Sequence, residues 1–293
     1  MQRKLVRQGN NALTVTLPAK WTKLHNLAAG SIVEIQENES KLQISSKQLR
    51  STRSVDIKLD SRKEYSIRSI IASCYKEGYG IINLHFEKQI SPKILHKVIS
   101  SFTGLEIISH TKNSFEIRCF LNIEEGDCAQ LLEKLFHTTQ YIASLLKPDP
   151  QAADIDEINT LVELSVRKLR DHALRAIATM RFGAEKSYEY YDIVTVLEKI
   201  AASLRRLMKT LQETKDPEAQ EVEKIQEHFS LLYKAYLSQK FKTASKAYLA
   251  QLELREQYFK ELTKKTKRSG FLAHAYHISQ LYVHLASRIM SLY

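Results

Sequence analysis

Apolar and polar residues alternate near the start of the chain, in the period-two pattern of half-buried strands. Leu13, Val15 and Leu17 are separated by threonines, and Leu5 belongs to a similar run before them. Between the two runs, residues 8–11 read Gln-Gly-Asn-Asn, and glycine and asparagine tolerate the positive φ angles of tight turns. The pattern predicts a strand, a turn and a second strand.

A short helix and two further strands are expected before residue 48. Pro18 suits the first position of a helix that carries Trp21, and Gly30 marks the exit from that helix. Apolar residues alternate again in residues 32–35 and 42–44, so we predict the order β-β-α-β-β. A unit of under about 50 residues rarely buries enough apolar surface to fold alone. Since this one has no cysteine, we expect a partner chain to complete its core.

Residues 49–122 combine the strand period with the helical period. A polar stretch leads into an alternating run at residues 55–59, and helical spacing in residues 65–74 stops at Gly78. Ser91-Pro92 suits the N-cap and first turn of a second helix. Two last apolar runs flank Thr111-Lys112-Asn113 as a hairpin. We predict a small β-α-β-α-β-β domain.

From residue 125 to the end, apolar residues recur at helical spacing. Pro148, Gly183 and Pro217 interrupt this pattern, which predicts six helices in two three-helix halves. One of the predicted apolar stripes comprises Ile158, Leu161, Ser165, Leu169, His172 and Ile177.

The fold class that follows is an α+β multidomain chain. The predicted domains are residues 1–48, a small strand-rich domain, residues 49–122, a small α+β connector, and residues 123–293, an all-α bundle of two three-helix repeats.

Composition narrows the classes of partner and compartment. The formal net charge of +11 over 293 residues favours a polyanion such as nucleic acid. Three cysteines without C-x-x-C spacing argue against a disulfide framework or a thiolate zinc site, and fit a reducing cytoplasm. No apolar stretch reaches the roughly 20 residues that span a bilayer, so we expect a soluble protein without membrane insertion.

The sequence lacks the residue sets that most enzymes need. We find no nucleophile with a base and an acid, no glycine-rich phosphate loop, and no carboxylate pair at catalytic spacing. We therefore expect a protein that is not an enzyme and has no cofactor.

Residues 3–35, RKLVRQGNNALTVTLPAKWTKLHNLAAGSIVEI, resemble the SpoVT-AbrB family. The spacing of Leu17-Pro18, Trp21, Leu27, Gly30 and Val33 agrees with the pattern of that family. The resemblance implies a swapped-hairpin homodimer, in which two chains interleave into one β-barrel and present paired basic residues to double-stranded DNA.

The resemblance also implies which residues contact DNA. These are Arg3, Lys4 and Arg7, with Asn10 and Asn11 on the adjoining turn as further candidates. Basic residues neutralise phosphates and release counterions, and arginine can also donate two hydrogen bonds to a guanine edge. The alternative reading is that these charges only keep an edge strand soluble.

The rest of the chain resembles the PhoU family, whose members regulate phosphate uptake. The runs SIIASCYKEGYGIINLHF and FTGLEIISHTKNSFEI are similar to the connector of archaeal PhoU-like proteins, and Leu197-Glu198-Lys199-Ile200-Ala201 is similar to a PhoU helix motif. Metal-binding members place carboxylates four residues apart on one helical face. Here Ala202 and Arg206 occupy the positions where Asp and Asn are expected, so we expect no metal cluster.

Two sets of isolated ligand-type residues remain on the predicted helices. We expect the glutamates to be surface charges paired with Lys or Arg, and the histidines, which share one helix without a carboxylate companion on their face, to bind no metal. The residues are Glu163, Glu198, Glu253, His274, His277 and His284.

Together these patterns predict a cytoplasmic, dimeric transcriptional regulator that binds DNA through its N-terminal domain and receives a signal through its helices. The PhoU resemblance implies a link to phosphate uptake or signalling, with a phosphate transporter or sensor protein as a further partner. The alternative is an adaptor that regulates such a partner through protein contacts, with an N-terminal domain that only dimerises.

Overall fold

The computed structural model describes residues 2–9, 12–38, 41–46, 53–123, 127–180, 186–214, 219–264 and 269–293. The chain divides into two compact units, Met1–Arg53 and Ser54–Tyr293, and each is described by itself. The finer division at residues 48 and 122 stays a prediction.

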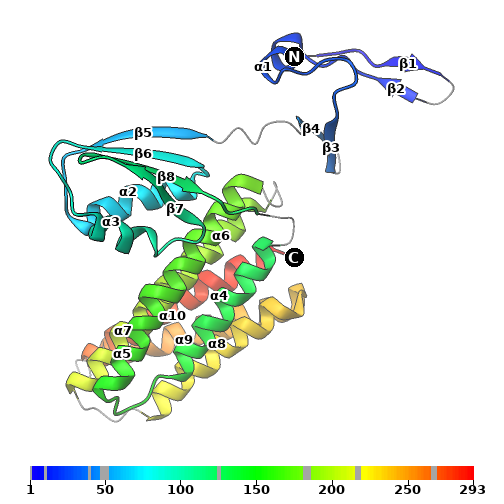
Figure 1. The fold of residues 1–293 in the computed structure, drawn as a ribbon. Helices are drawn as coiled ribbons and strands as arrows, with labels where there is room; N and C mark the ends of the chain where they lie inside the picture. Colours follow the sequence, from blue (N-terminus) through cyan, green and yellow to red (C-terminus); the bar gives the residue numbers. More distant parts are fainter. Residues whose placement is uncertain are drawn as a thin grey trace. The chain divides into compact units, whose positions relative to one another are not determined.

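The first unit contains the predicted order of strands and helix (Figure 1). Its strands form two separate antiparallel pairs, β1 with β2 and β3 with β4. The elements are β1 (Val6–Gln8), β2 (Ala12–Thr14), α1 (Ala19–Leu24), β3 (Val33–Asn38) and β4 (Lys41–Ser46).

The start of α1 differs by one residue from the prediction. Pro18 has an extended ψ of 124° and is the N-cap residue, so Ala19 is the first helical position. The Pro18 carbonyl accepts hydrogen bonds from the backbone N–H groups of Trp21 and Thr22, at 2.9 and 3.0 Å. Proline is compatible with this N-cap position, because the N–H group that it lacks would have no hydrogen-bond partner within the helix.

The second unit begins with a four-stranded sheet of order β5-β6-β8-β7. Strands β5 and β6 are parallel, and the other neighbours are antiparallel. Figure 1 shows α2 and α3 on one face of this sheet, which matches the inward burial of Leu59, Leu84 and Ile117. The predicted β-α-β-α-β-β order is confirmed. The elements are β5 (Ser54–Leu59), α2 (Glu64–Lys76), β6 (Ile81–Phe86), α3 (Pro92–Ile99), β7 (Leu105–His110) and β8 (Ser114–Cys119).

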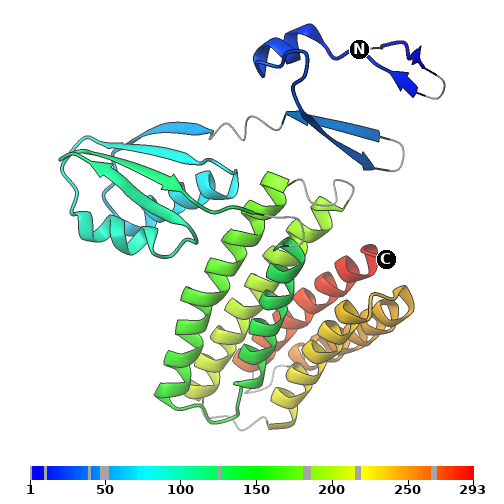
Figure 2. The same ribbon diagram turned by 45° about the vertical axis from the view of Figure 1, so that its right-hand side comes forward.

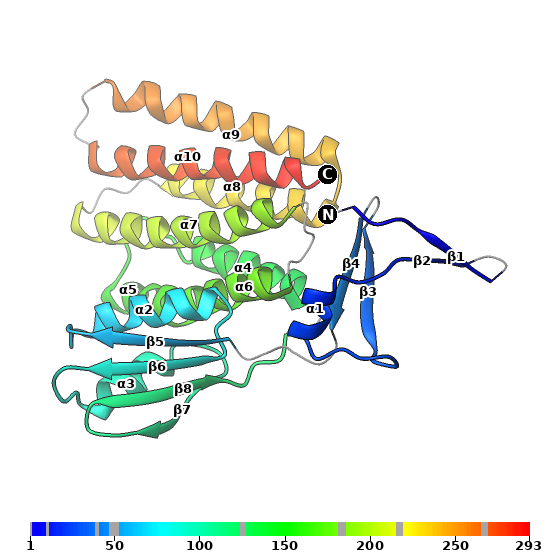
Figure 3. The same ribbon diagram turned by 90° about the horizontal axis from the view of Figure 1, so that it is seen from above.

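The rest of the second unit is helical. Figures 2 and 3 show the helices side by side, running in alternating directions. Helix α4 packs on α6, α7 and α8, and α10 packs on α7, α8 and α9, so one continuous apolar core joins the two halves. The elements are α4 (Asp127–Ser144), α5 (Ala152–Thr160), η1 (Leu161–Val166), α6 (Arg167–Met180), α7 (Ser187–Thr214), α8 (Ala219–Ser238), α9 (Phe241–Leu262) and α10 (Ser269–Ser291).

These observations confirm an α+β chain with a small N-terminal β region and a mostly helical remainder. They do not identify the helical part as a PhoU-like bundle. Among the described residues, no helix is long and apolar enough to cross a membrane.

The segment η1 is a π-helix, which the sequence pattern did not predict. The Arg167 N–H donates to the Val162 carbonyl, five residues earlier, and this wider spacing changes which residues face the core. Val162 and Val166 are fully buried, whereas Ser165, Leu169 and His172 of the predicted stripe are only partly buried. Ile158 and Ile177 of the stripe are buried, and Leu161 and Leu169 pack against the core as partly buried residues. The stripe omitted Val162 and Val166 because it assumed an unbroken α-helical period.

Helix α2 of the sheet layer packs against α6 of the helical region. Gly78 follows α2 with a φ of +87°, and a Cβ atom there would lie 2.7 Å from the Thr179 methyl group of α6. The buried guanidinium of Arg175 donates to the carbonyls of Tyr75 and Tyr79, at 2.8 and 2.9 Å. These contacts hold the sheet layer against α6.

Candidate nucleic-acid interface

The first unit has no core of its own among its described side chains. None of the side chains described in residues 2–46 is buried, although apolar residues normally enter an interior when one is available. Its large apolar residues that are exposed are Leu5, Val6, Leu13, Val15, Leu24, Ile32, Ile35 and Leu42.

The β3–β4 pair shows how this apolar surface is arranged. Ile35 is directly opposite Ile44, and Glu37 is opposite Leu42. Residues that are opposite in an antiparallel pair, and residues two apart along a strand, share a face. Ile35, Ile44 and Leu42 therefore lie on one face, where Ile35 and Leu42 are 60% and 67% exposed. We expect such an apolar face to pack against another protein surface, because burial removes it from water.

The predicted DNA-contacting residues lie before and within the other strand pair, β1–β2. Arg3 and Lys4 precede β1, and Arg7 is in β1 opposite Leu13. All three side chains are exposed, and within the described part of the chain none of them forms an ion pair or a side-chain hydrogen bond. Asn10 and Asn11 lie outside the described residues. The exposed cations are thus available to a polyanion.

The predicted pairing of helical glutamates with Lys or Arg is confirmed for Glu163 and Glu198. Glu163 pairs with Arg167 and, at 2.6 Å, with Arg205 of α7. Glu198 lies 3.4 Å from Arg170. Glu253 is exposed.

His284 of α10 has a carboxylate partner that the pattern of its own helical face did not predict. Its Nε2 lies 2.8 Å from the Asp192 carboxylate of α7, and Arg288 donates to the same oxygen at 2.6 Å. The companion is on another helix, so helical spacing alone could not reveal it. Over the described ranges there is no group of three or more His, Cys, Asp or Glu residues that could hold a metal ion.

Sequence reasoning missed a fully buried charge, that of Asp171, among the residues that the structure describes. The Asp171 side chain is fully buried in α6, where Arg170 donates to it at 2.8 Å and Arg68 of α2 at 3.4 Å. Arg68 is 103 residues away in sequence. The only signal was a polar residue beside the apolar positions of the predicted stripe.

Three partly buried histidines predict a loss of stability in mild acid. Burial is the largest cause that lowers the pKa of His172, His228 and His274 below the ordinary value of 6.5. Because the unfolded chain then binds protons more readily than the folded one, stability is full above about pH 6.5 and decreases as the pH falls below it. We expect the denaturant midpoint to decrease between pH 7.5 and pH 5.5.

A histidine replacement separates this effect from other titrations. His228→Asn removes the imidazole that lies 3.0 Å from the Gln251 amide oxygen, and should reduce the pH dependence of the midpoint. The exposed His96 of α3 provides the control, since His96→Asn should leave that dependence close to the original. Equal pH dependence in all three proteins would contradict the prediction.

Comparisons with known proteins bear on the first unit alone. A family model described as "Antidote-toxin recognition MazE, bacterial antitoxin" matches residues 6–51. Neither a curated protein nor a solved structure matches the chain. Arg7 lies inside the matched residues, whereas Arg3 and Lys4 lie just before them. The N-terminal unit therefore carries a MazE/AbrB-like domain, consistent with the predicted SpoVT-AbrB type.

Proposed function

We propose that this chain is a non-enzymatic, dimeric transcriptional regulator that binds double-stranded DNA through its N-terminal unit. The observation that carries the proposal is the MazE/AbrB-like match over residues 6–51. It falls on a unit with uncovered apolar residues and unpaired basic residues among those described, which are the properties expected of half a dimeric DNA-binding domain.

A second copy of the chain is the proposed cover for the apolar residues. In the swapped-hairpin arrangement implied by the SpoVT-AbrB resemblance, the strands of two chains interleave into one barrel. A two-fold axis then presents each basic residue twice, once to each half-site of the DNA. Arg3, Lys4 and Arg7 are proposed to contact phosphates or base edges there, with Asn10 and Asn11 beside them.

The helical region is proposed to receive the signal. Its PhoU-like identity, and with it a link to phosphate uptake and a cytoplasmic location, rests on the resemblance of short sequence runs alone. No comparison supports that extension. A change in the DNA affinity of the full chain on addition of inorganic phosphate would support it.

The second candidate function is protein recognition, with an N-terminal unit that only dimerises. It is favoured by the description of the matched family, which names recognition of a toxin by its antidote. The partner would be a toxin protein, or the phosphate transporter or sensor that the PhoU resemblance implies. DNA binding distinguishes the two candidates.

The test is binding of the purified full chain to its own promoter and to random duplex DNA across a salt series. We expect affinity to fall steeply with salt, by about 0.9 log units per log unit of salt for each phosphate contacted, and to be higher for the promoter. Arg3→Ala/Arg7→Ala should weaken binding and reduce this slope, because each dimer loses four positive charges.

Two control variants separate the roles of charge and geometry. Arg3→Lys/Arg7→Lys keeps the charge, so it should keep the salt slope while losing promoter preference if arginine reads bases. Lys209→Ala/Lys246→Ala removes the same charge from exposed positions on α7 and α9 and should have little effect. Absence of binding at low salt would reject the regulator and favour protein recognition.

A further inference from the structure

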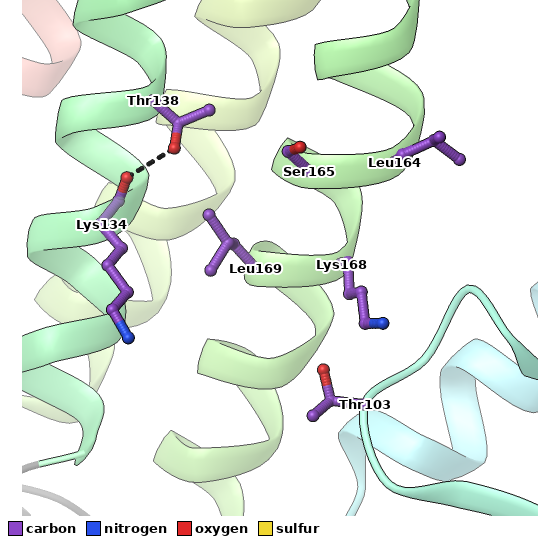
Figure 4. Close-up of a pocket in the computed structure, with 7 residues that line it drawn as sticks. All are labelled: Thr103, Lys134, Thr138, Leu164, Ser165, Lys168 and Leu169. Carbon is purple, nitrogen blue, oxygen red and sulfur yellow. Dashed lines mark hydrogen bonds between the residues drawn. The ribbon is translucent and has the colours of Figure 1, made fainter.

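An open pocket of about 430 Å³ lies in the second unit, beside the π-helix. Figure 4 shows its lining, which comes from α4, from η1 with the start of α6, and from the loop after α3. The lining residues are Thr103, Lys134, Thr138, Leu164, Ser165, Lys168 and Leu169. The pocket thus joins two ammonium groups, three hydroxyl groups and two leucine side chains.

The positive charge of this pocket has no described counterion. Neither Lys134 nor Lys168 pairs with a carboxylate in the part of the chain that the structure describes. No acidic residue lines the pocket, whereas Glu133 lines the neighbouring hollow of about 410 Å³ that shares Lys134 and Thr138. An anion is therefore favoured in the first pocket rather than in the second.

His172 lies near the two lysines of this pocket. It lies one helical turn after Lys168, and its buried Nε2 has no hydrogen-bond partner within the described residues. Burial is the main reason that its pKa is lowered, and Arg175, Lys134 and Lys168 lower that pKa further, while Asp127 opposes them. Lys134 and Lys168 are therefore both close enough to act on the same neighbouring group.

Two hydroxyl groups are available as donors in the pocket. Thr138 donates to the Lys134 carbonyl at 2.8 Å, as helical threonines commonly do. The Ser165 hydroxyl in η1 has no such described bond, and neither does the Thr103 hydroxyl. Bond spacing of five residues in a π-helix alters which side chains face outward, and such segments occur frequently at functional sites.

The pocket wall that contains Thr103 is held in place by buried contacts. The Thr103 carbonyl accepts a hydrogen bond from the Tyr75 hydroxyl at 2.9 Å. The Arg175 guanidinium lies 4.9 Å from the Tyr75 ring centroid and donates to the Tyr75 carbonyl. These contacts fix the position of the Thr103 backbone, and so of one wall of the pocket, before a ligand arrives.

We propose that this pocket binds a small organic oxyanion. In Figure 4 the ammonium groups of Lys134 and Lys168 lie on opposite sides of Leu169, so both flexible side chains turn toward the bound charged group, and the hydroxyls of Ser165 and Thr103 lie at the edges of the same pocket. The volume exceeds that of a bare tetrahedral ion, and Leu164 and Leu169 offer contact to an aliphatic part of the ligand. The ammonium and hydroxyl groups supply charge-assisted and neutral hydrogen bonds to the oxyanion. This site does not depend on DNA binding by the first unit.

The first test uses pyridoxal 5′-phosphate, whose aldehyde forms an imine with a lysine amine and whose phosphate seeks cations. After borohydride reduction, peptide mass spectrometry of the full chain locates the label. We expect Lys134 or Lys168 to be labelled about tenfold faster than the exposed Lys209 and Lys246. Inorganic phosphate should protect the pocket lysines selectively. Uniform labelling of all lysines, or no protection, would overturn the proposal.

The second test measures reversible binding of ribose 5-phosphate to the full chain by ³¹P NMR. Lys134→Gln/Lys168→Gln should weaken binding by about tenfold for each ammonium lost. Lys209→Gln/Lys246→Gln removes the same charge elsewhere and should bind normally. Equal weakening in both variants would show a general charge effect and reject the site. Since neither test involves DNA, failure of this site and failure of the regulator are distinguishable.

Discussion

Replacing Asp171 by asparagine is expected to lower the free energy of unfolding by about 3–5 kcal/mol, as is typical when one partner of a buried ion pair is removed. The carboxylate is fully buried between Arg170 and Arg68. Asparagine keeps the volume of the side chain but not its charge, so both guanidinium groups lose the Asp171 carboxylate. Arg170 retains Glu198 at 3.4 Å, and the loss at Arg68 therefore dominates.

Denaturant unfolding of the full chain measures this change. The matched control is Glu64→Gln, which removes an exposed ion pair, Lys97–Glu64 at 2.9 Å, and should cost less than about 1 kcal/mol. An Arg68→Met/Asp171→Leu variant should recover most of the loss, because apolar residues of similar volume can replace a buried ion pair. A cost for Asp171→Asn no greater than that of the control would refute the importance of this contact.

An aspartate in place of Ile35 is expected to dissociate the proposed dimer. Ile35 lies on the uncovered apolar face of β3–β4, opposite Ile44. In a two-fold interface the substitution enters twice, and each buried carboxylate without a partner costs several kcal/mol. We expect the dimer dissociation constant to rise at least about 100-fold, and DNA affinity to fall with it. Analytical ultracentrifugation measures the first effect.

The second unit should retain its fold in this variant. Its own core lies in residues 54–293, so the helical circular dichroism signal should not change. Ile35→Val is the matched control at the same position and should leave dimerisation intact. A variant Ile35→Asp that remains dimeric would place the interface outside this face, and the proposed swapped-hairpin arrangement would then be abandoned.

Local sequence patterns were sufficient where neighbours along the chain decide the structure. The alternation in residues 55–59 predicted β5, and Ser91-Pro92 marks the start of α3 as predicted. In these segments the period of the apolar residues and the local turn chemistry favour the same structure.

The candidate DNA-contacting residues came from a resemblance, and the structure locates only part of them. Arg3, Lys4 and Arg7 are exposed and unpaired among the described residues, while Asn10 and Asn11 stay untested. A pattern of basic residues cannot separate DNA binding from solubility, because both roles require exposed charge. Their assignment therefore remains a prediction for the salt series.

By itself, the sequence determined the order of the strands and most helices. It also determined that the N-terminal unit is basic and has too few apolar residues to form a core alone. Each of these results depends on residue type and short-range spacing. Tertiary structure decided the strand order β5-β6-β8-β7, the π-helix at Leu161–Val166, and the pairing of Asp171 with Arg68 and of His284 with Asp192. The π-helix is a local change in hydrogen-bond spacing that the apolar period did not mark, whereas the other features join segments far apart in the chain. Their partners meet only after the helices have packed, and no local period encodes that meeting.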